Sequence, residues 1–357
     1  MKPGTVGNRT GRKSAADHAS GTVGDSSERE QFDCLARERR NEIKLHCYRL
    51  MGSLTEAEDL TQETFARAWR ARGELTSEGS VRPWLYRIAT NACLDAIRRR
   101  KRERRLWSDA PPMQTGDPAE LGTPDLDIPW LDPMPDTVLI GVADDVAGPH
   151  ARYEQAEAVR LAFLACVQIL PARQRAIFLL CEVLGWSAAE AAAAFAITPQ
   201  ATSSLLQRAR RAFEAAYRHE PEWAAASPAD RKVAELYAAA LADRDIDSFV
   251  SLLRSDATIH MPPWRAWLSG RTAIGRFNAQ AWGRYGGFRT HVLSANGRGA
   301  VIVYARATGD TVWRPHSLHV LEIADGAIAS IVAFVGPLAP SLFAESGFPQ
   351  NPPSSLH

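Results

Sequence analysis

The stretch LPARQRAIFLLCEVLGWSAAEAAAAFAITPQATSSLLQRARRAF, residues 170–213, decides the fold of the middle of the chain. A first helix is predicted to follow Pro171 and to end at Gly185, because apolar residues recur between them at the spacing of one helix face. A second, Ala-rich helix is predicted to begin at Ser187, which forms a capping box with Glu190. The stretch is therefore expected to be helical with short turns.

A third helix is predicted to begin after Thr198, a favoured N-cap residue, with Pro199 in its first turn. Two short helices joined by a tight turn form the helix-turn-helix pattern, whose second helix enters the major groove of DNA. The early turns of this helix carry groups suited to base edges, and its later turns carry groups suited to phosphates. The predicted DNA contacts are Gln200, Thr202, Ser203, Ser204, Gln207, Arg208, Arg210 and Arg211. A plain three-helix bundle with a solvated basic face is the alternative.

The same stretch resembles the region of sigma-70-family factors, in the extracytoplasmic-function group, that binds the promoter −35 element. The shared features are an LP-x-x-x-R start, a G-W-S turn into an Ala- and Glu-rich helix, and an R-A-R end. The chain departs from the commonest pattern at residues 195–197, where Phe-Ala-Ile replaces a Leu-Gly pair, and at residues 200–202, where Gln-Ala-Thr replaces Gly-Thr-Val. The resemblance implies the fold, whereas the departures leave open which bases are read.

Composition and charge narrow the classes of protein that fit the chain. Its 357 residues suffice for two or three domains, and 45% apolar with 23% charged residues is typical of a soluble globular protein. The net charge is only +1, so nucleic acid must be bound by local patches. The five cysteines form no CxxC pair and are expected to be buried reduced thiols, with a zinc or redox role as the alternative. No cofactor, metal site or catalytic residue is predicted.

The N-terminus and the apolar runs of the chain predict where the protein acts. No stretch is long and apolar enough to span a bilayer, and the N-terminus lacks the apolar core of a signal peptide. We therefore expect a cytoplasmic protein with no membrane partner. Residues 1–30 are rich in Gly, Ser, Thr and charged residues and are predicted to be a disordered tail.

Residues 31–106 are predicted to form an all-helical domain. Its first helix spans residues 32–51, its second contains LTEAEDLTQETFARAWRA (residues 54–71) with Thr55 as the expected cap, and its third contains VRPWLYRIATNACLDAIRRRKRERR (residues 81–105). The third helix ends in a basic run that exceeds what a helix C-terminus needs. This run predicts contact with phosphates, and a solvated charge run is the alternative.

This domain also resembles the extracytoplasmic-function sigma factors. Residues 54–71 are similar to the helix that grips the clamp of the β′ subunit of RNA polymerase, which implies core-binding roles for Glu58, Asp59, Gln62 and Glu63. Residues 81–102 are similar to the helix that opens and reads the promoter −10 element, which implies DNA-binding roles for Tyr86, Arg87, Thr90, Asn91, Asp95 and Arg98. Trp84, on the same helix, is expected to pack in the core. The implied partners are the RNA polymerase core, with its β′ and β subunits, and promoter DNA.

Residues 107–150 are predicted to be a linker, because they contain no Lys or Arg, many acidic residues and many Pro and Gly. A flexible tether with no binding role is one interpretation. The resemblance implies another, in which the acidic segment threads a basic channel of the polymerase, as the linkers of sigma factors do. An apolar cluster within the linker can dock on a folded domain. Its members are Ile128, Trp130, Leu131 and Met134. Residues 151–220 then complete the helix-turn-helix domain.

Residues 229–347 are predicted to form a separate α+β domain, followed by a tail at residues 348–357. Two helices precede a strand that ends at Pro262-Pro263; a short helix and three strand-like runs follow, with a hairpin at Asp325-Gly326. This order resembles the SnoaL-like, NTF2-like fold, a cone with a pocket inside a curved antiparallel sheet. The candidate pocket residues are Asp256, His260, Trp264, Trp267, Arg289, His316 and His319. His316 and His319 are not two residues apart, so they need not face the same side of a strand.

The predicted fold class is therefore multidomain, with two all-α domains, the second a helix-turn-helix, followed by an α+β NTF2-like cone. The predicted function is that of a sigma factor, not an enzyme, whose C-terminal domain regulates it by packing on the sigma regions or by sensing a ligand. No acid–base pair stands out in that domain. Two alternatives remain: a ligand-responsive helix-turn-helix regulator, which leaves residues 31–106 unexplained, and a SnoaL-like small-molecule enzyme with a DNA-binding appendage.

Overall fold

The computed structural model describes residues 20–74, 81–99, 105, 110–139, 160–216, 228–338, 342–343 and 348–352. The chain divides into two compact units, residues 1–40 and 41–357. The features discussed below lie in the second unit unless stated. Predictions for residues 1–19, for residues 100–104 of the basic run, for residues 140–159 and for residues 353–357 fall outside the described part of the chain.

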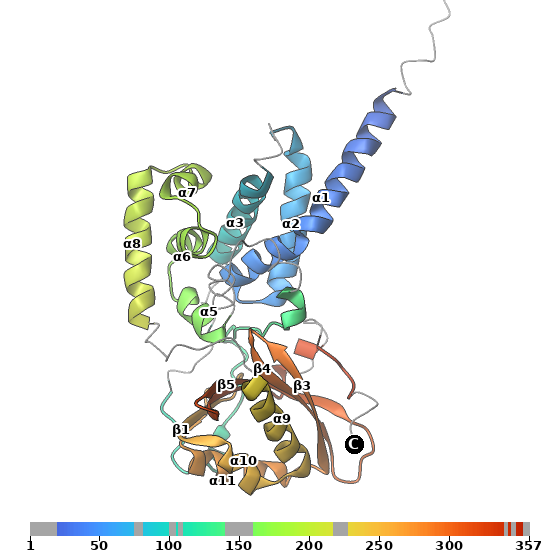
Figure 1. The fold of residues 1–357 in the computed structure, drawn as a ribbon, viewed down its shortest axis with the longest axis vertical. Helices are drawn as coiled ribbons and strands as arrows, with labels where there is room; N and C mark the ends of the chain where they lie inside the picture. Colours follow the sequence, from blue (N-terminus) through green and yellow to red (C-terminus); the bar gives the residue numbers. More distant parts are fainter. Residues whose placement is uncertain are drawn as a thin grey trace, which may run out of the picture. The chain divides into compact units, whose positions relative to one another are not determined.

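Three long helices form the first helical domain (Figure 1). They are α1 (Ser20–Met51), α2 (Leu54–Arg70) and α3 (Val81–Arg99), and a 3-10 turn η1 (Arg72–Glu74) follows α2. Helix α1 begins earlier than expected, so residues 20–30 are helical where a disordered tail was predicted. Helix α2 is capped by Ser53, whose hydroxyl accepts from the amide of Glu56 at 3.4 Å, rather than by Thr55.

The helix-turn-helix domain follows the predicted order closely. Its elements are α5 (Leu161–Gln168), α6 (Ala172–Phe178), the π-helix η6 (Leu179–Val183), α7 (Ala188–Phe195) and α8 (Pro199–Ala216). The capping box of Ser187 and Glu190 is formed, and the Thr198 hydroxyl accepts from the amide of Ala201 at 3.1 Å. Three aromatic rings hold α5, α6 and α8 together; Phe213 lies 5.2 Å from Phe163 and 4.8 Å from Phe178 between centroids.

The C-terminal domain is a six-stranded sheet with three helices packed on one face (Figure 1). Its elements are α9 (Pro228–Asp243), α10 (Ile246–Ser251), β1 (Leu253–His260), β2 (Trp267–Ser269), α11 (Arg271–Trp282), β3 (Gly287–Ala295), β4 (Arg298–Arg306), β5 (Arg314–Ala324) and β6 (Ala327–Val335). The strand order is β2-β1-β6-β5-β4-β3, and β1 pairs with β6 in parallel. The sheet is therefore mixed, whereas an antiparallel sheet was expected.

Two tight turns join the long strands of this sheet. Asn296 and Gly297 connect β3 to β4, and Asp325 and Gly326 connect β5 to β6, as predicted. All four residues have positive φ, the conformation that two-residue hairpin turns of this kind require. The apolar core of the domain lies between the sheet and helices α9, α10 and α11.

The described part of the linker is folded, which agrees with docking of its apolar cluster on a folded domain and not with a plain tether. It forms the 3-10 turns η3 (Pro118–Leu121) and η4 (Asp136–Leu139). Within the predicted apolar cluster, Trp130, Leu131 and Met134 are 5%, 1% and 0% exposed. An acidic composition predicts a solvated segment. A few apolar side chains are nevertheless enough to fix a chain on a neighbouring surface.

Cysteines and apolar helices complete the description. Cys47, Cys93 and Cys166 are buried, Cys181 is half-buried and Cys34 is exposed, and all five are free thiols. Among the described residues, no helix has the length and apolarity that a bilayer crossing requires.

Candidate functional site

The exposed face of α8 carries most of the residues predicted to contact the −35 element. Its exposed members are Gln200, Ser203, Ser204, Gln207, Arg208, Arg210 and Arg211. Thr202 is 0% exposed, and its hydroxyl donates to the carbonyl of Thr198 at 3.2 Å. Thr202 therefore packs inside the domain and is removed from the base-reading set. The sequence pattern missed this because i, i+1 neighbours on a helix point in different directions.

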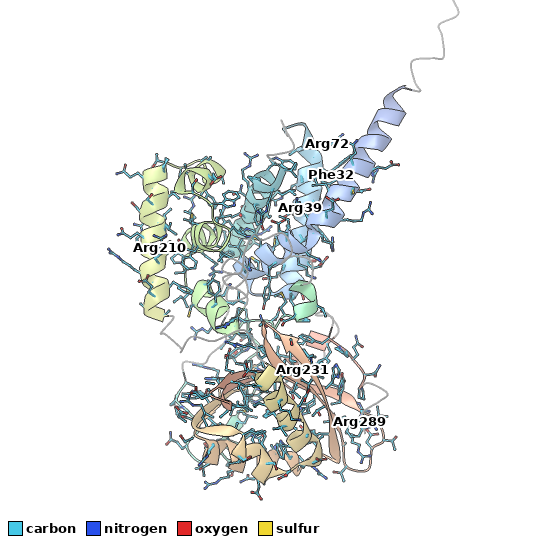
Figure 2. The ribbon with its side chains drawn as sticks, viewed as in Figure 1. Phe32, Arg39, Arg72, Arg210, Arg231 and Arg289 are labelled. Atoms are coloured by element: carbon cyan, nitrogen blue, oxygen red, sulfur yellow. The ribbon has the colours of Figure 1, made fainter. Side chains whose placement is uncertain are left out.

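Arg210 projects from α8 and pairs with the π-helical segment before the turn (Figure 2). Its Nη2 and Nε atoms lie 2.7 and 3.0 Å from Oε1 of Glu182. This pair joins α8 to the preceding helix and offsets one positive charge of the surface predicted to contact DNA. Arg208 and Arg211 are exposed on the same helix. A phosphate bound at Arg210 would compete with the Glu182 carboxylate.

The helix predicted to read the −10 element, α3, buries two of its proposed contacts. Tyr86 is 2% exposed, its hydroxyl donates to Oε1 of Glu42 at 2.8 Å, and its ring meets the edge of Trp186 at 6.2 Å between centroids. Burial raises the pKa of this phenol, so it stays protonated. Since Trp186 lies in the turn before α7, the helix-turn-helix domain covers this part of α3.

Thr90 is the second buried member of the predicted −10 set. It is 1% exposed, and its hydroxyl shares a hydrogen bond of 2.8 Å with Nε2 of His46. Burial, with a further contribution from Arg49, lowers the pKa of His46 to about 3, so the imidazole is neutral. The remaining predicted residues are accessible: Asn91 and Arg98 are exposed, and Arg87 and Asp95 are half-buried. Trp84, as expected, packs in the core at 7% exposure.

The face of α2 predicted to bind polymerase is partly engaged in ion pairs. Asp59 and Gln62 are exposed, whereas Glu58 lies 3.0 Å from Nζ of Lys44. Nε of Arg67 lies 2.7 Å from Glu63, and this hydrogen bond holds the pKa of the Glu63 carboxyl below its ordinary value. The same guanidinium reaches Asp95 of α3 at 3.3 Å. The proposed polymerase-binding and DNA-binding helices are thus joined by one arginine.

Two side chains of the helix-turn-helix domain complete the hydrogen bonding at the end of α1. Arg175 is 0% exposed, and its Nη1 donates to the carbonyl of Leu50 at 2.9 Å and to Oε1 of Gln168 at 2.6 Å. Gln168 donates through Nε2 to the carbonyls of Arg49 and Leu50 at 3.2 and 3.3 Å. A helix leaves its last carbonyls without intrahelical partners, and here the second domain supplies them.

The turn between β3 and β4 fixes the linker to the first helical domain. Asn296 is 0% exposed; its Oδ1 accepts from the amide of Met134 at 2.8 Å, and its Nδ2 donates to the hydroxyl of Tyr48 at 2.9 Å. Tyr48 in turn donates to the carbonyl of Asp132 at 2.7 Å. Asp136 accepts from the amide of Gly297 at 2.9 Å. We call this set the three-way joint, because α1, the linker and the C-terminal domain meet in it.

A cavity of about 210 Å³ lies inside the C-terminal domain. Of the candidate pocket residues, Trp264, His316 and His319 line it. The sequence pattern did not identify Tyr285 and Ser317 as lining residues, nor the linker residues Pro118 and Leu121, which also line it.

The other four candidate residues lie away from the cavity. Asp256 is exposed and pairs with Arg254 at 3.0 Å; Arg289, on β3, lies 4.9 Å from the ring of Trp313 (Figure 2). His260 stacks on Trp267 at 5.2 Å between centroids, and burial lowers its pKa to about 4. These assignments were wrong for the cavity because residue type alone does not give the direction of a side chain.

A β-bulge explains why His316 and His319 share the cavity although three positions separate them. In the β4–β5 ladder Val303 pairs with Ser317 and Tyr304 with Pro315, so His316 is the extra residue. A bulge interrupts the alternation of side chains along a strand and re-aims one of them. Both imidazoles therefore reach the same cavity, which strict alternation does not allow.

Comparison with known families and structures agrees with this arrangement. The family model described as Sigma-70 region 2 matches residues 35–103, that of Sigma-70, region 4 matches residues 160–213, and that of the SnoaL-like domain matches residues 233–331. These matches fall on the first helical domain, the helix-turn-helix domain and the C-terminal domain in that order.

Curated relatives support the same assignment. The sigma factor SigG of Mycobacterium tuberculosis is 39% identical over 337 residues, which cover 90% of this chain and 85% of that protein. SigE of Mycolicibacterium smegmatis is 30% identical over 55% of this chain and 67% of its own length. The crystal structure of SigJ of M. tuberculosis shows the same fold, with a TM-score of 0.53 and 20% identity, over 89% of this chain and 99% of that one. Two sigma domains followed by a SnoaL-like domain, together with this likeness across nearly the whole chain, place the protein in the extracytoplasmic-function group of the sigma-70 family of RNA polymerase sigma factors.

Proposed function

We propose that three helices of this sigma factor make its contacts with promoter DNA and core polymerase. Helix α8 contacts the −35 element, α3 contacts the −10 element, and the exposed face of α2 around Asp59 and Gln62 binds the β′ subunit of core polymerase. The observation that supports the first assignment most directly is the row of polar and arginine side chains that α8 leaves exposed. Since polymerase and chromosomal DNA are its proposed partners, we place its action in the cytoplasm.

DNA binding by α8 is tested with holoenzyme on a promoter selected by in vitro transcription of a genomic library. Arg208→Ala and Arg210→Ala are each expected to weaken binding and to lower the salt slope of log K by about 0.9 per lost phosphate contact. Arg208→Ala should have the larger effect, because Glu182 already holds Arg210 at 2.7 Å. Arg231→Ala, on α9 of the C-terminal domain, is the matched control with an exposed arginine. Unchanged slopes for both α8 variants would exclude this placement of the helix.

The binding of core polymerase by α2 is tested separately by pull-down. Asp59→Lys is expected to reduce capture of core polymerase, because it reverses a charge at an exposed position of the proposed face. Glu235→Lys, a charge reversal on α9, serves as the control. Equal capture of both variants would remove α2 from the interface.

The C-terminal domain is proposed to regulate the sigma regions and not to catalyse a reaction. The three-way joint supports this, because Asn296 contacts α1 and the linker together. No carboxylate occurs among the described residues that line the cavity, which favours binding over acid–base catalysis. Removing residues 229–357 should change run-off transcription while leaving capture of core polymerase intact. Turnover of a small molecule by the full chain would favour the enzyme alternative.

A further inference from the structure

The cavity of the C-terminal domain has the size and lining of a small-molecule site. Its volume of about 210 Å³ exceeds the roughly 150 Å³ that suffices for benzene in an apolar protein cavity. Most of its walls are apolar or aromatic. They include Leu241, Ile259, Phe277, Trp282, Phe288 and Val303. A ligand of the size of a substituted benzene, and mostly apolar, fits this description.

One wall is polar and is built from a continuous chain of hydrogen bonds. Tyr237 Oη lies 2.8 Å from Nδ1 of His319, whose Nε2 lies 2.9 Å from Oγ of Ser317. The same hydroxyl lies 3.0 Å from Nδ1 of His316, whose Nε2 lies 3.0 Å from Oη of Tyr285. Burial lowers the pKa of His316 to about 4 and that of His319 to about 3, so both rings are neutral.

The proton count of this chain leaves one donor over. Two tyrosine hydroxyls, one serine hydroxyl and two neutral imidazoles carry five protons, and they form four hydrogen bonds. A neutral imidazole donates through one nitrogen only, so the spare proton can sit on Tyr237, Ser317 or Tyr285. Tyr237 is 1% exposed and does not line the cavity, so a spare proton there would be a costly buried donor. The spare donor therefore belongs to Ser317 or Tyr285, which both line the cavity.

The linker supplies the remaining wall and is held there by two tryptophans. Pro118 and Leu121 line the cavity. Just beyond them, Nε1 of Trp264 donates to the carbonyl of Gly122 at 3.1 Å, and at the other end Nε1 of Trp267 donates to the carbonyl of Ala110 at 2.8 Å. A molecule in the cavity therefore directly contacts the segment that joins the two sigma domains.

We propose that this cavity binds a compact, neutral, largely apolar molecule that carries one hydrogen-bond acceptor, and that linker residues Pro118 and Leu121 close the site over it. The acceptor atom of the ligand accepts a hydrogen bond from the spare donor, Tyr285 or Ser317, and its apolar body fills the rest of the cavity. The idea extends the proposed regulatory function, since the ligand would be sensed through the linker. It is tested without polymerase or DNA, so its failure is distinct from a failure of that function.

The test uses three probes of equal heavy-atom count with the full-length protein. Acetophenone is neutral and carries one acceptor, α-methylstyrene has the same shape without an acceptor, and benzoate carries a negative charge. Ligand-observed NMR titrations are expected to rank acetophenone first, α-methylstyrene about five- to ten-fold weaker, and benzoate weakest. The anion must be desolvated in a mostly apolar cavity, and Arg284, the guanidinium among the lining residues, is exposed to solvent. Benzoate binding as tightly as acetophenone, or equal affinity for acetophenone and α-methylstyrene, would overturn the proposed ligand class.

Variants locate the site. Ala281→Phe, on α11, fills the cavity and should abolish binding of all probes. Of Tyr285→Phe and Ser317→Ala, the variant that removes the spare donor should weaken acetophenone several-fold and leave α-methylstyrene unchanged. Leu121→Ala should weaken both neutral probes about three- to ten-fold through lost apolar contact. Leu126→Ala is its control, because that linker residue is 60% exposed and outside the cavity. Binding that ignores Ala281→Phe and both polar variants would place the probes elsewhere. Identical effects of the two leucine changes would exclude the linker as a wall.

Discussion

A single alanine in the turn of the helix-turn-helix domain holds a conformation that glycine normally adopts. Ala196, the C-cap of α7, has φ 50 and ψ 44, in the left-handed region. The sequence departs from its family at this residue, where a glycine is usual, and the structure keeps the backbone geometry nonetheless. The cost is local strain of about 1–2 kcal/mol.

Replacing that alanine should stabilise the domain. Ala196→Gly is expected to raise the free energy of opening of α7 by about 1 kcal/mol, since relief of strain exceeds the extra entropy of glycine. Amide hydrogen exchange of α7 measures it. Ala193→Gly, at an exposed interior position of the same helix, should lower the same quantity by about 1 kcal/mol. A decrease for both variants would show that Ala196 is not strained.

Residue types alone predicted the capping box, the Thr198 cap and the Asp325-Gly326 turn, because each depends on a few neighbours in the chain. They did not predict that Thr202 is buried, since the direction of a side chain depends on what packs against its helix. The same holds for the cavity, where His260 and Asp256 have suitable chemistry but lie away from it.

Among elements, the linker approaches α11 most tightly at a glycine, next to Thr115, whose carbonyl accepts from Nη1 of Arg276 at 3.2 Å. Gly116 has φ +71, and a Cβ at this position would lie 2.7 Å from the carbonyl oxygen of Ala273. Gly122, with φ +69, has no atom within 4 Å of the equivalent position. The two glycines therefore both have positive φ but differ in the space beside them.

This contrast predicts how the linker is released. Gly116→Ala should raise hydrogen exchange and protease cleavage across residues 110–127, because the chain must move away from α11. Gly122→Ala, at φ 69 and ψ −154, carries backbone strain of about 1–3 kcal/mol without that close approach and should leave the linker docked. Equal cleavage of the two variants would mean that backbone strain, and not the close approach to Ala273, controls docking.

The three-way joint predicts a second effect at this scale. Asn296→Asp keeps the shape of the side chain but removes the Nδ2 donor to Tyr48 and places a charge at a position that is 0% exposed. Breaking such a buried contact typically costs about 1–3 kcal/mol. Exchange should increase at residues 132–136 and in the β3–β4 turn, whereas Asp325→Asn, in the exposed β5–β6 turn, should have no such effect.

Helices and strands were predictable from periodicity, but the contacts between them were not. The β1–β6 parallel pairing and the bulge at His316 depend on how distant strands meet, and no local pattern encodes either. The linker was misjudged for a related reason: its backbone hydrogen bonds go to Trp267 and Pro263, far away in the sequence.

For the molecule as a whole, buried histidines predict a loss of stability in mild acid. Burial lowers the pKa of His46 and His319 to about 3 and that of His260 and His316 to about 4. In the unfolded chain these rings become protonated around pH 6.5, whereas in the folded protein they stay neutral at that pH. The free energy of unfolding should therefore fall as the pH drops from about 6.5 to 5, with a slope for each histidine that rises from about 0.7 to about 1.4 kcal/mol per pH unit.

Denaturant titrations across this range measure the slope. His46→Phe removes one of the four groups, so the slope near pH 5 should decrease by about 1.4 kcal/mol per pH unit even if the variant is less stable, because the slope counts protons. The window ends at about pH 5 because carboxyl groups titrate below it, and Asp136, whose pKa burial raises, acts in the opposite direction. A wild-type slope near zero would contradict the neutral state of these rings.

The contact between Trp186 and Tyr86 has a consequence for how a promoter is engaged. If Tyr86 touches the −10 strand, as proposed for its helix, it becomes reachable only when Trp186 departs, since the phenol ring is 2% exposed. If DNA binding by α8 displaces Trp186, promoter contact by α8 and exposure of Tyr86 are coupled. By thermodynamic reciprocity, a duplex bound to α8 then makes contact of α3 with the −10 strand more favourable. That contact strengthens DNA binding by α8 by the same factor.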